Sequence, residues 1–600
     1  MHPERFTSPR VRCAEPATSG CERERADEPR RLLARSTGSG PRRGRGVHAR
    51  GFVRCILPAF AVFLCGLTVP PSAAAAPSAR PNIILMMADD LGYSDLGCYG
   101  SEIATPNLDA LAARGVRFTQ FYNGAVCCPT RAALLTGLYS HQAGVGWMVN
   151  HGEDSRPPGP YQGYLNARCV TLAEVLRGAG YRTLMSGKWH VGESRPHWPV
   201  DRGFDRYFGL ISGAANYFDP RKTLRASVVR QVVLDDQLFE APREGFYMTD
   251  AIADHAISFL AETGREPRPF FLYVPFTAPH TPLHAKPEDI ARHRGRYRIG
   301  WDALRVERFR RMQAMGILDE AAQLSPRETG VTPWTEEQEP DLQDLKMAIY
   351  AAQVESMDRS IGRILAQLRA IGKERETLII FLSDNGGSSS ENISDRASHL
   401  NRSPYLGGPE SYESYGRSWG QASNTPYRKF KVWTHEGGII TPLIAVWPGV
   451  VTNEGGLCRV PAHIIDLMAT FVDISGAAYP KRIGDQEILP MEGISLAPLL
   501  RGGAGPRANP TAWEKPICWE YQGNRAVRNG RWKLVAEEGQ PWELYDLGRD
   551  PTELHNLAAA EPERVQALTR QYEAWAQRCG VAPWNEISGN LTNLPVAPSR

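Results

Sequence analysis

Short apolar runs alternate with longer amphipathic stretches from residue 80 onward. Four of the runs, over residues 83–87, 183–185, 270–276 and 378–382, are followed directly by polar side chains. Runs of this length are typical of strands buried on both faces, and the stretches between them are long enough for crossover helices. The pattern therefore predicts an α/β fold, with a large, mostly parallel central sheet flanked by helices.

The carboxyl ends of these runs carry the first candidate functional residues, which are Asp89, Asp90, Lys188, His190, His280, Asp384 and Asn385. Open α/β sheets bind their ligands beyond the carboxyl ends of their strands. We therefore expect these side chains to meet at one edge of the sheet.

The central region carries three further patterns. A charged segment over residues 287–343 predicts a helical insertion over the sheet, and a longer helix over 345–371 should end at Gly372. Residues 386–425 are rich in Ser, Gly, Asn and Tyr with little periodicity. That composition predicts a long loop, and long loops are usually functional or mobile.

The pattern changes near residue 506. Asn529 and Gly530 separate two short runs, which predicts a hairpin over 526–535. Another strand over 542–547 and a final helix over 561–576 complete a small antiparallel sheet packed by one helix. We divide the chain into a leader with a signal region (1–79), a main domain (80–505) and a smaller carboxyl-terminal domain (506–600).

The leader holds most of the positive charge. Residues 1–54 contain 13 Lys or Arg against 6 acids, so the rest of the chain carries a net charge of −4, which argues against nucleic-acid binding. An apolar run over 55–69, interrupted by Pro58, precedes small residues, as in a secretory signal. The alternative is a membrane anchor, but the run is shorter than the ~20 residues that span a bilayer. We expect an exported protein, periplasmic or extracellular, cleaved between Ala73 and Arg80, with no stable membrane span.

Among the cysteines, Cys127 and Cys128 stand in the string CCPTRAALLTG. Pro129 suits a first helical turn and Gly137 suits a helix end, which places Cys127 at a helix amino terminus, where backbone N–H groups and the helix dipole favour an anion. A buried structural cysteine at a helix start explains these features equally well.

The acidic residues predict a metal site. Asp89, Asp90 and Asp384 would raise one another's pKa values when brought together, unless a cation neutralises them. Oxygen ligands, including that of Asn385, favour calcium or magnesium over zinc. The alternative is that Asp89 or Asp90 caps a helix.

The string C-x-P-x-R followed by T-G resembles the signature of the type I sulfatases of the alkaline phosphatase superfamily. The resemblance continues in family order through RPNIILMMADDLGYSDLGCYG, GKWHVG, FTAPHTPLH, FLSDNGG, HEGGIITPLIAVWPG, RAVRNGRWKLV and WELYDLGRDPTELHNLA. It covers nearly everything after Arg80, and several motifs in order are far more specific than one.

The resemblance implies that a maturation enzyme oxidises Cys127 to formylglycine. It implies that Ca2+, rather than Mg2+, is held by Asp89, Asp90, Asp384 and Asn385 together with residue 127. It assigns catalytic roles to Cys127, Arg131, Lys188, His190, His280 and Lys431. Lys431 is chosen over Lys429 because it lies five residues before Glu436, as the family lysine does; either His280 or Lys431 would protonate the leaving group.

The implied reaction converts an aryl sulfate and water to a phenol and sulfate, on a sulfated small molecule or glycan. The charged insertion and the CCPTR form resemble bacterial-type arylsulfatases. Two alternatives stay open: a phosphonate monoester or phosphodiester hydrolase of the same superfamily, and a non-catalytic carbohydrate-binding protein on a sulfatase scaffold.

Overall fold

The computed structural model describes residues 80–149, 156–223, 230–391, 404–505, 507–509, 513 and 515–592. The leader and signal region predicted over residues 1–79 lie outside these ranges. Among the described residues, no helix is long and apolar enough to cross a membrane.

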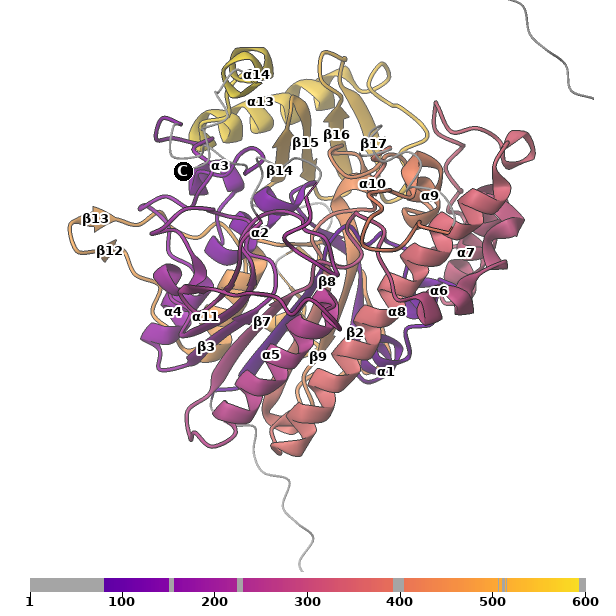
Figure 1. Cartoon of the computed structure of the whole chain (residues 1–600). Coiled ribbons are helices and arrows are strands. Elements are labelled where there is room, and N and C mark those ends of the chain that lie inside the picture. Colours follow the sequence, from indigo (N-terminus) through magenta and orange to yellow (C-terminus); the bar gives the residue numbers. More distant parts are fainter. Residues whose placement is uncertain are drawn as a thin grey trace, which may run out of the picture. The chain divides into compact units, whose positions relative to one another are not determined.

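An 11-stranded sheet forms the centre of the described chain (Figure 1). Its order is β10-β2-β9-β8-β1-β7-β3-β4-β5-β6, and β11 also pairs with β2. The five strands from β8 to β4 run parallel to one another, whereas β9 and β5 at the two ends of this set run antiparallel to them. The strands are β1 (Asn82–Ala88), β2 (Val116–Tyr122), β3 (Arg182–Ser186), β4 (Arg206–Leu210), β5 (Val232–Leu234), β6 (Gln237–Leu238), β7 (Phe270–Pro275), β8 (Thr377–Ser383), β9 (Ile440–Val446), β10 (Leu457–Cys458) and β11 (Ala462–His463).

Helices cover both faces of this sheet. Alternate side chains of β1 point to opposite faces, so Ile84 and Met86 join one hydrophobic core while Ile83 and Leu85 join another. The first core includes α1 (Pro106–Arg114), α5 (Met248–Thr263) and α8 (Pro340–Ala370), and the second includes α2 (Cys127–Thr136), α4 (Leu172–Gly178) and α11 (Asp466–Ser475). The prediction of an α/β fold with a mostly parallel sheet is confirmed.

The charged insertion is helical, as predicted, over α6 (Pro287–His293) and α7 (Gly300–Ala314). Its α6 packs against α8, and its α7 packs mainly against α9 (Gly416–Ser423). Arg308 of α7 is fully buried and forms ion pairs with Asp95 and Glu102. The segment thus attaches through buried charge as well as apolar contact.

Helix α9 also corrects the prediction of one long loop over 386–425. Its sequence, GRSWGQAS, has little intrinsic helix preference. Trp419 is fully buried in the helix and meets the rings of Trp301 and Trp334 edge-on or tilted. Burial of an aromatic side chain contributes about 1.5–3 kcal/mol, enough to outweigh poor local propensity.

The carboxyl-terminal part forms a four-stranded antiparallel sheet, β14 (Ile517–Tyr521), β15 (Asn524–Asn529), β16 (Trp532–Ala536) and β17 (Glu543–Asp546). The predicted hairpin is present, and Asn529 pairs with Trp532, so the turn itself is Gly530 and Arg531. Gly530 has φ +62°, a conformation that glycine adopts without strain. The long helix α13 (Pro562–Cys579) packs on β15, and α14 (Trp584–Thr592) follows it.

Candidate active site

The acidic residues meet because two parallel strands end side by side. Ala88 of β1 pairs with Ser383 of β8, so the next residues, Asp89 and Asp384, are neighbours. The Asp90 backbone N–H donates to Asp384 Oδ1 at 3.2 Å. Asp90 has φ +66°, a left-handed conformation that aspartate tolerates better than most residues and that is common at functional sites.

Three basic side chains neutralise the three carboxylates. Lys188 Nζ lies 2.5 Å from Asp89 Oδ2, Arg131 Nη2 lies 2.8 Å from Asp384 Oδ2, and Lys431 Nζ lies 2.7 Å from Asp90 Oδ1. Mutual repulsion among the acids is therefore relieved by protein cations. Repulsion alone does not require a metal, so the donor atoms decide whether one fits.

The pKa values follow from burial and from these pairs. Burial alone would raise the pKa of Asp89, but Lys188, His280 and Arg131 hold it below its usual range. Burial, and then the charge of Asp89, raise the pKa of Asp384 well above its usual range despite Arg131. Within this pair, Asp384 therefore holds a proton more readily than Asp89 does.

Two buried oxygens fit a hard cation. Asp89 Oδ1 and Asn385 Oδ1 have no hydrogen-bond partner among the described residues. The Asn385 amide nitrogen instead donates to Asp90 Oδ1 at 2.7 Å, which turns its oxygen away from that carboxylate. Unpaired buried oxygens are costly, and an oxygen-ligated divalent ion would satisfy both. Asp89, Asp90 and His280 also place potential ligand atoms within 4.8 Å of one another.

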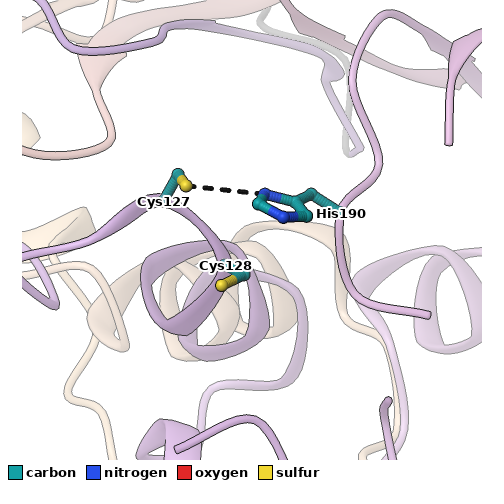
Figure 2. A group of neighbouring side chains, drawn as sticks. All are labelled: Cys127, Cys128 and His190. Carbon is teal, nitrogen blue, oxygen red and sulfur yellow. Dashed lines mark hydrogen bonds between the residues drawn. The ribbon is translucent and has the colours of Figure 1, made fainter. Parts of the chain in front are cut away.

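Cys127 is the first residue of α2, and its Sγ lies 3.4 Å from Nδ1 of His190, which follows β3 (Figure 2). The neighbouring Cys128 side chain leaves the helix in another direction, as Figure 2 shows, and its Sγ accepts from the Val149 N–H at 3.3 Å. A hydrogen bond from Cys128, followed by the charges of Lys188 and Lys431, lowers the pKa of Cys127 well below the usual thiol range although burial opposes this. Burial raises the pKa of Cys128.

His280 and Lys431 stand on the open side of the cluster. His280 Nε2 lies 3.7 Å from Asp90 Oδ2, and Nδ1 lies 2.6 Å from the Thr281 carbonyl oxygen. Burial lowers the pKa of His280 although Asp90 opposes this. The two side chains are 18% and 11% exposed, whereas those of Arg131 and Lys188 are fully buried. Solvent and a substrate can therefore reach this side first.

Two nearby residues, Lys429 and His284, point elsewhere. Lys429 pairs with Glu537 at 2.8 Å rather than with the acidic cluster. The ring of His284 is held by the Tyr217 N–H and the Ser411 carbonyl, and burial lowers its pKa to about 4. The structure thus brings together every residue that the sequence placed at the site, and separates them from these two.

Sequence reasoning missed the apolar side of the site. Cys127, Val126 and Tyr521 form a small buried cluster, against which Trp147, Met148 and Val432 pack. Tyr521 comes from β14, almost 400 residues after the cysteine. No local pattern marks it, because its position depends on how the carboxyl-terminal sheet packs against the main sheet.

Known sulfatases are similar to this chain in sequence. The "Sulfatase" family model matches residues 81–477, and the "N-sulphoglucosamine sulphohydrolase, C-terminal" model matches residues 427–576. The chain is 34% identical to an uncharacterized sulfatase of Schizosaccharomyces pombe over 86% of this chain and 97% of the relative. It is also 34% identical to an arylsulfatase of Klebsiella aerogenes, over 70% of this chain and 92% of that enzyme.

Solved structures are similar to this chain in fold. The crystal structure of Ps i-CgsB superposes with a TM-score of 0.63 at 26% identity, over 86% of this chain and 98% of that one. The phosphonate monoester hydrolase of Agrobacterium radiobacter shares the fold, with a TM-score of 0.50 at 22% identity, over 83% of this chain and 96% of that one. Since the family model spans most of the chain and the site residues lie in one cluster, the chain belongs to the sulfatase family and is a sulfuric ester hydrolase.

Proposed function

We propose that this enzyme is an exported arylsulfatase that uses formylglycine at position 127 and a calcium ion. The observation that carries the proposal is the position of Cys127, which begins α2 and faces His190 beside three carboxylates and three basic groups. Formylglycine supplies a hydrated aldehyde, with one hydroxyl to attack sulfur and a second that permits release of sulfate.

Five residues would hold the metal, which are Asp89, Asp90, Asp384, Asn385 and residue 127. The unpartnered oxygens of Asp89 and Asn385 support this set. Calcium supplies charge that stabilises the sulfuryl oxygens in the transition state. Magnesium is less suited, because it demands near-ideal octahedral geometry and keeps several waters.

The basic residues have separable roles. Arg131 is fully buried between Asp384 and Asp89, so it positions carboxylates rather than substrate. Lys188 is equally buried and holds Asp89. Lys431 is partly accessible and binds Asp90, so its Nζ can also face the sulfate oxygens and stabilise charge that develops there.

Two histidines serve proton transfer. The His190 ring faces position 127 through Nδ1, so it takes and returns the proton of that residue. Burial lowers the pKa of His280, which makes its conjugate acid a stronger proton donor, and its ring lies on the accessible side. We assign protonation of the leaving oxygen to His280, with Lys431 as the alternative donor.

The substrate is a sulfated small molecule or glycan. Relatives named as N-acetylgalactosamine-6-sulfatase, such as the dog enzyme at 29% identity over 83% of this chain, support a sugar sulfate as the natural substrate. An aryl sulfate is the simplest test compound, because its leaving group needs little protonation. Activity also requires a maturation enzyme that converts Cys127.

The rival activity is phosphonate monoester or phosphodiester hydrolysis, which the shared fold permits. The deciding experiment compares kcat/KM of matured enzyme on one aryl sulfate and on the matched aryl phosphodiester and phosphonate monoester. We expect the sulfate to be preferred. Preference for either phosphorus ester would overturn the proposal, and no turnover of any of them by enzyme that carries the aldehyde would favour a glycan-restricted enzyme.

A further inference from the structure

The unconverted chain contains a second arrangement of ligands beside the oxygen cluster. Figure 2 draws its three residues, Cys127, Cys128 and His190. The two sulfur atoms and a ring nitrogen of His190 all lie within 4.8 Å of one another, and all three residues are buried. Two sulfurs and an imidazole are soft or borderline donors, which suit zinc rather than calcium. We infer that the precursor, before Cys127 is oxidised, binds a thiophilic divalent ion such as Zn2+ through Cys127, Cys128 and His190.

The histidine is already in the tautomer that a metal ligand requires. His190 Nε2 lies 3.2 Å from the Val149 carbonyl oxygen, which can only accept, so Nε2 carries the hydrogen. In the neutral ring this leaves the Nδ1 lone pair directed at Cys127 Sγ. A backbone carbonyl on the far ring nitrogen is the usual support of a metal-bound histidine.

The same residue, Val149, supports the second thiol. Its backbone N–H donates to Cys128 Sγ at 3.3 Å, and a hydrogen bond donated to sulfur favours the thiolate form. Val149 therefore contacts two of the three ligands through its two backbone groups. Such support from outside the ligand set distinguishes a formed site from a chance cluster.

Charge and distance agree with this assignment. Two thiolates and a neutral imidazole balance a dication, so the ion adds no net charge to a buried place. A tetrahedral site with Zn–S bonds of about 2.3 Å separates its sulfurs by about 3.8 Å, so the ligand atoms need to approach by about 1 Å at most. Water completes the fourth position.

Zinc binding at this place lies outside the sulfatase reaction, because it occurs in the chain that has not yet acquired its nucleophile. Oxidation of Cys127 to an aldehyde removes one of the two thiolates. Oxidation of Cys127 and binding of an ion to its sulfur should therefore exclude each other. A precursor that has bound Zn2+ should resist oxidation of Cys127.

The test uses full-length protein made in a host without formylglycine maturation, kept reduced by a phosphine and freed of metal. Co2+ is the probe, because thiolate ligation gives a sulfur-to-cobalt charge-transfer band that oxygen ligation does not. We expect the band to saturate at one ion per chain and to disappear when Zn2+ is added. In Cys128→Ser and His190→Ala the affinity should fall at least about tenfold, whereas Cys518→Ser, another buried thiol, should bind as the parent does.

Circular dichroism of each variant establishes that it is folded. The charge-transfer band is also measured in matured protein, where conversion of Cys127 removes one sulfur ligand without any mutation. Absence of the band from folded precursor, equal affinity in Cys128→Ser and the parent, or an unchanged band after conversion of Cys127 would each overturn the inference. Turnover is never measured, so these outcomes leave the proposed sulfatase activity untouched.

Discussion

Lys188 Nζ lies 2.5 Å from Asp89 Oδ2, and neither side chain is exposed to solvent. The lysine follows β3 and the aspartate follows β1, two strands that are separated in the sheet only by β7. Each residue alone would be costly to bury, so the pair is stable only while both members are present.

Replacement of Lys188 by Met should therefore reduce stability as well as activity. Loss of one member of a buried ion pair costs about 3–5 kcal/mol, although Arg131, 3.4 Å from the same Asp89 oxygen, should hold the loss near the lower value. Urea unfolding measures the loss. Lys222→Met removes a partly exposed pair with Glu410 and should cost about 1 kcal/mol or less. Equal losses in the two variants would contradict a buried structural role for Lys188.

The carboxyl ends of the central strands were predictable from sequence. Each apolar run indicates a strand, and the Asp, Lys or His that follows it marks the edge of the sheet at which that strand ends. The pairing of β1 with β8 then fixes Asp89 beside Asp384. Helix α9 was not predictable, since its stability comes from Trp419 against distant rings rather than from its own sequence.

The choice between Lys429 and Lys431 shows the same limit. They are two positions apart, and the choice of Lys431 depended on the family spacing to Glu436; the folded chain itself shows that Lys431 reaches Asp90 and Lys429 reaches Glu537. Tyr521 beside Cys127 depends on packing between two sheets and leaves no trace in either local sequence. Motifs thus predicted the polar half of the site, and tertiary packing determined the apolar half.

Calcium should stabilise the folded protein. Asp89 Oδ1 and Asn385 Oδ1 have no hydrogen-bond partner within the described ranges, and an ion that binds only the folded state stabilises it by about 2.7 kcal/mol at a concentration of 100 Kd. Thermal unfolding with and without Ca2+ measures the effect, and Mg2+ should give a smaller shift. Asn385→Ala should lose most of the calcium response. If metal-free protein shows no shift with either ion, or the variant responds fully, the proposed ligand set is wrong.

Stability should fall in acid through His463. Its ring is buried against Tyr139 and Trp519, and burial, helped by Arg507, lowers its pKa to about 3. In the unfolded chain this imidazole takes up a proton near pH 6.5, whereas in the folded chain it stays neutral until the pH approaches 3. The free energy of unfolding is therefore highest above pH 6.5 and falls as the pH is lowered toward 3. Between pH 7 and 4.5 the loss should be about 2.5 kcal/mol.

His463→Asn isolates that contribution, because an amide oxygen can still accept from the Ile465 N–H but does not titrate. Unfolding free energies of both proteins at pH 7 and 4.5 give the difference. The variant should lose about 2.5 kcal/mol less over this interval than the parent does. The same pH dependence in both would show that the histidine is protonated in the folded state.

The two adjacent cysteines should have different fates. The proposed maturation depends on the spacing to Pro129 and Arg131, which selects Cys127. The Cys127 side chain faces His190, whereas Cys128 contacts Met148 and the Val149 N–H. Peptide mass spectrometry after hydrazide trapping should therefore show an aldehyde at Cys127 and a thiol at Cys128. Cys127→Ala should abolish turnover, while Cys128→Ser should keep most of it, since serine can accept the same hydrogen bond. An aldehyde at Cys128, or full activity without one at Cys127, would refute the proposed nucleophile.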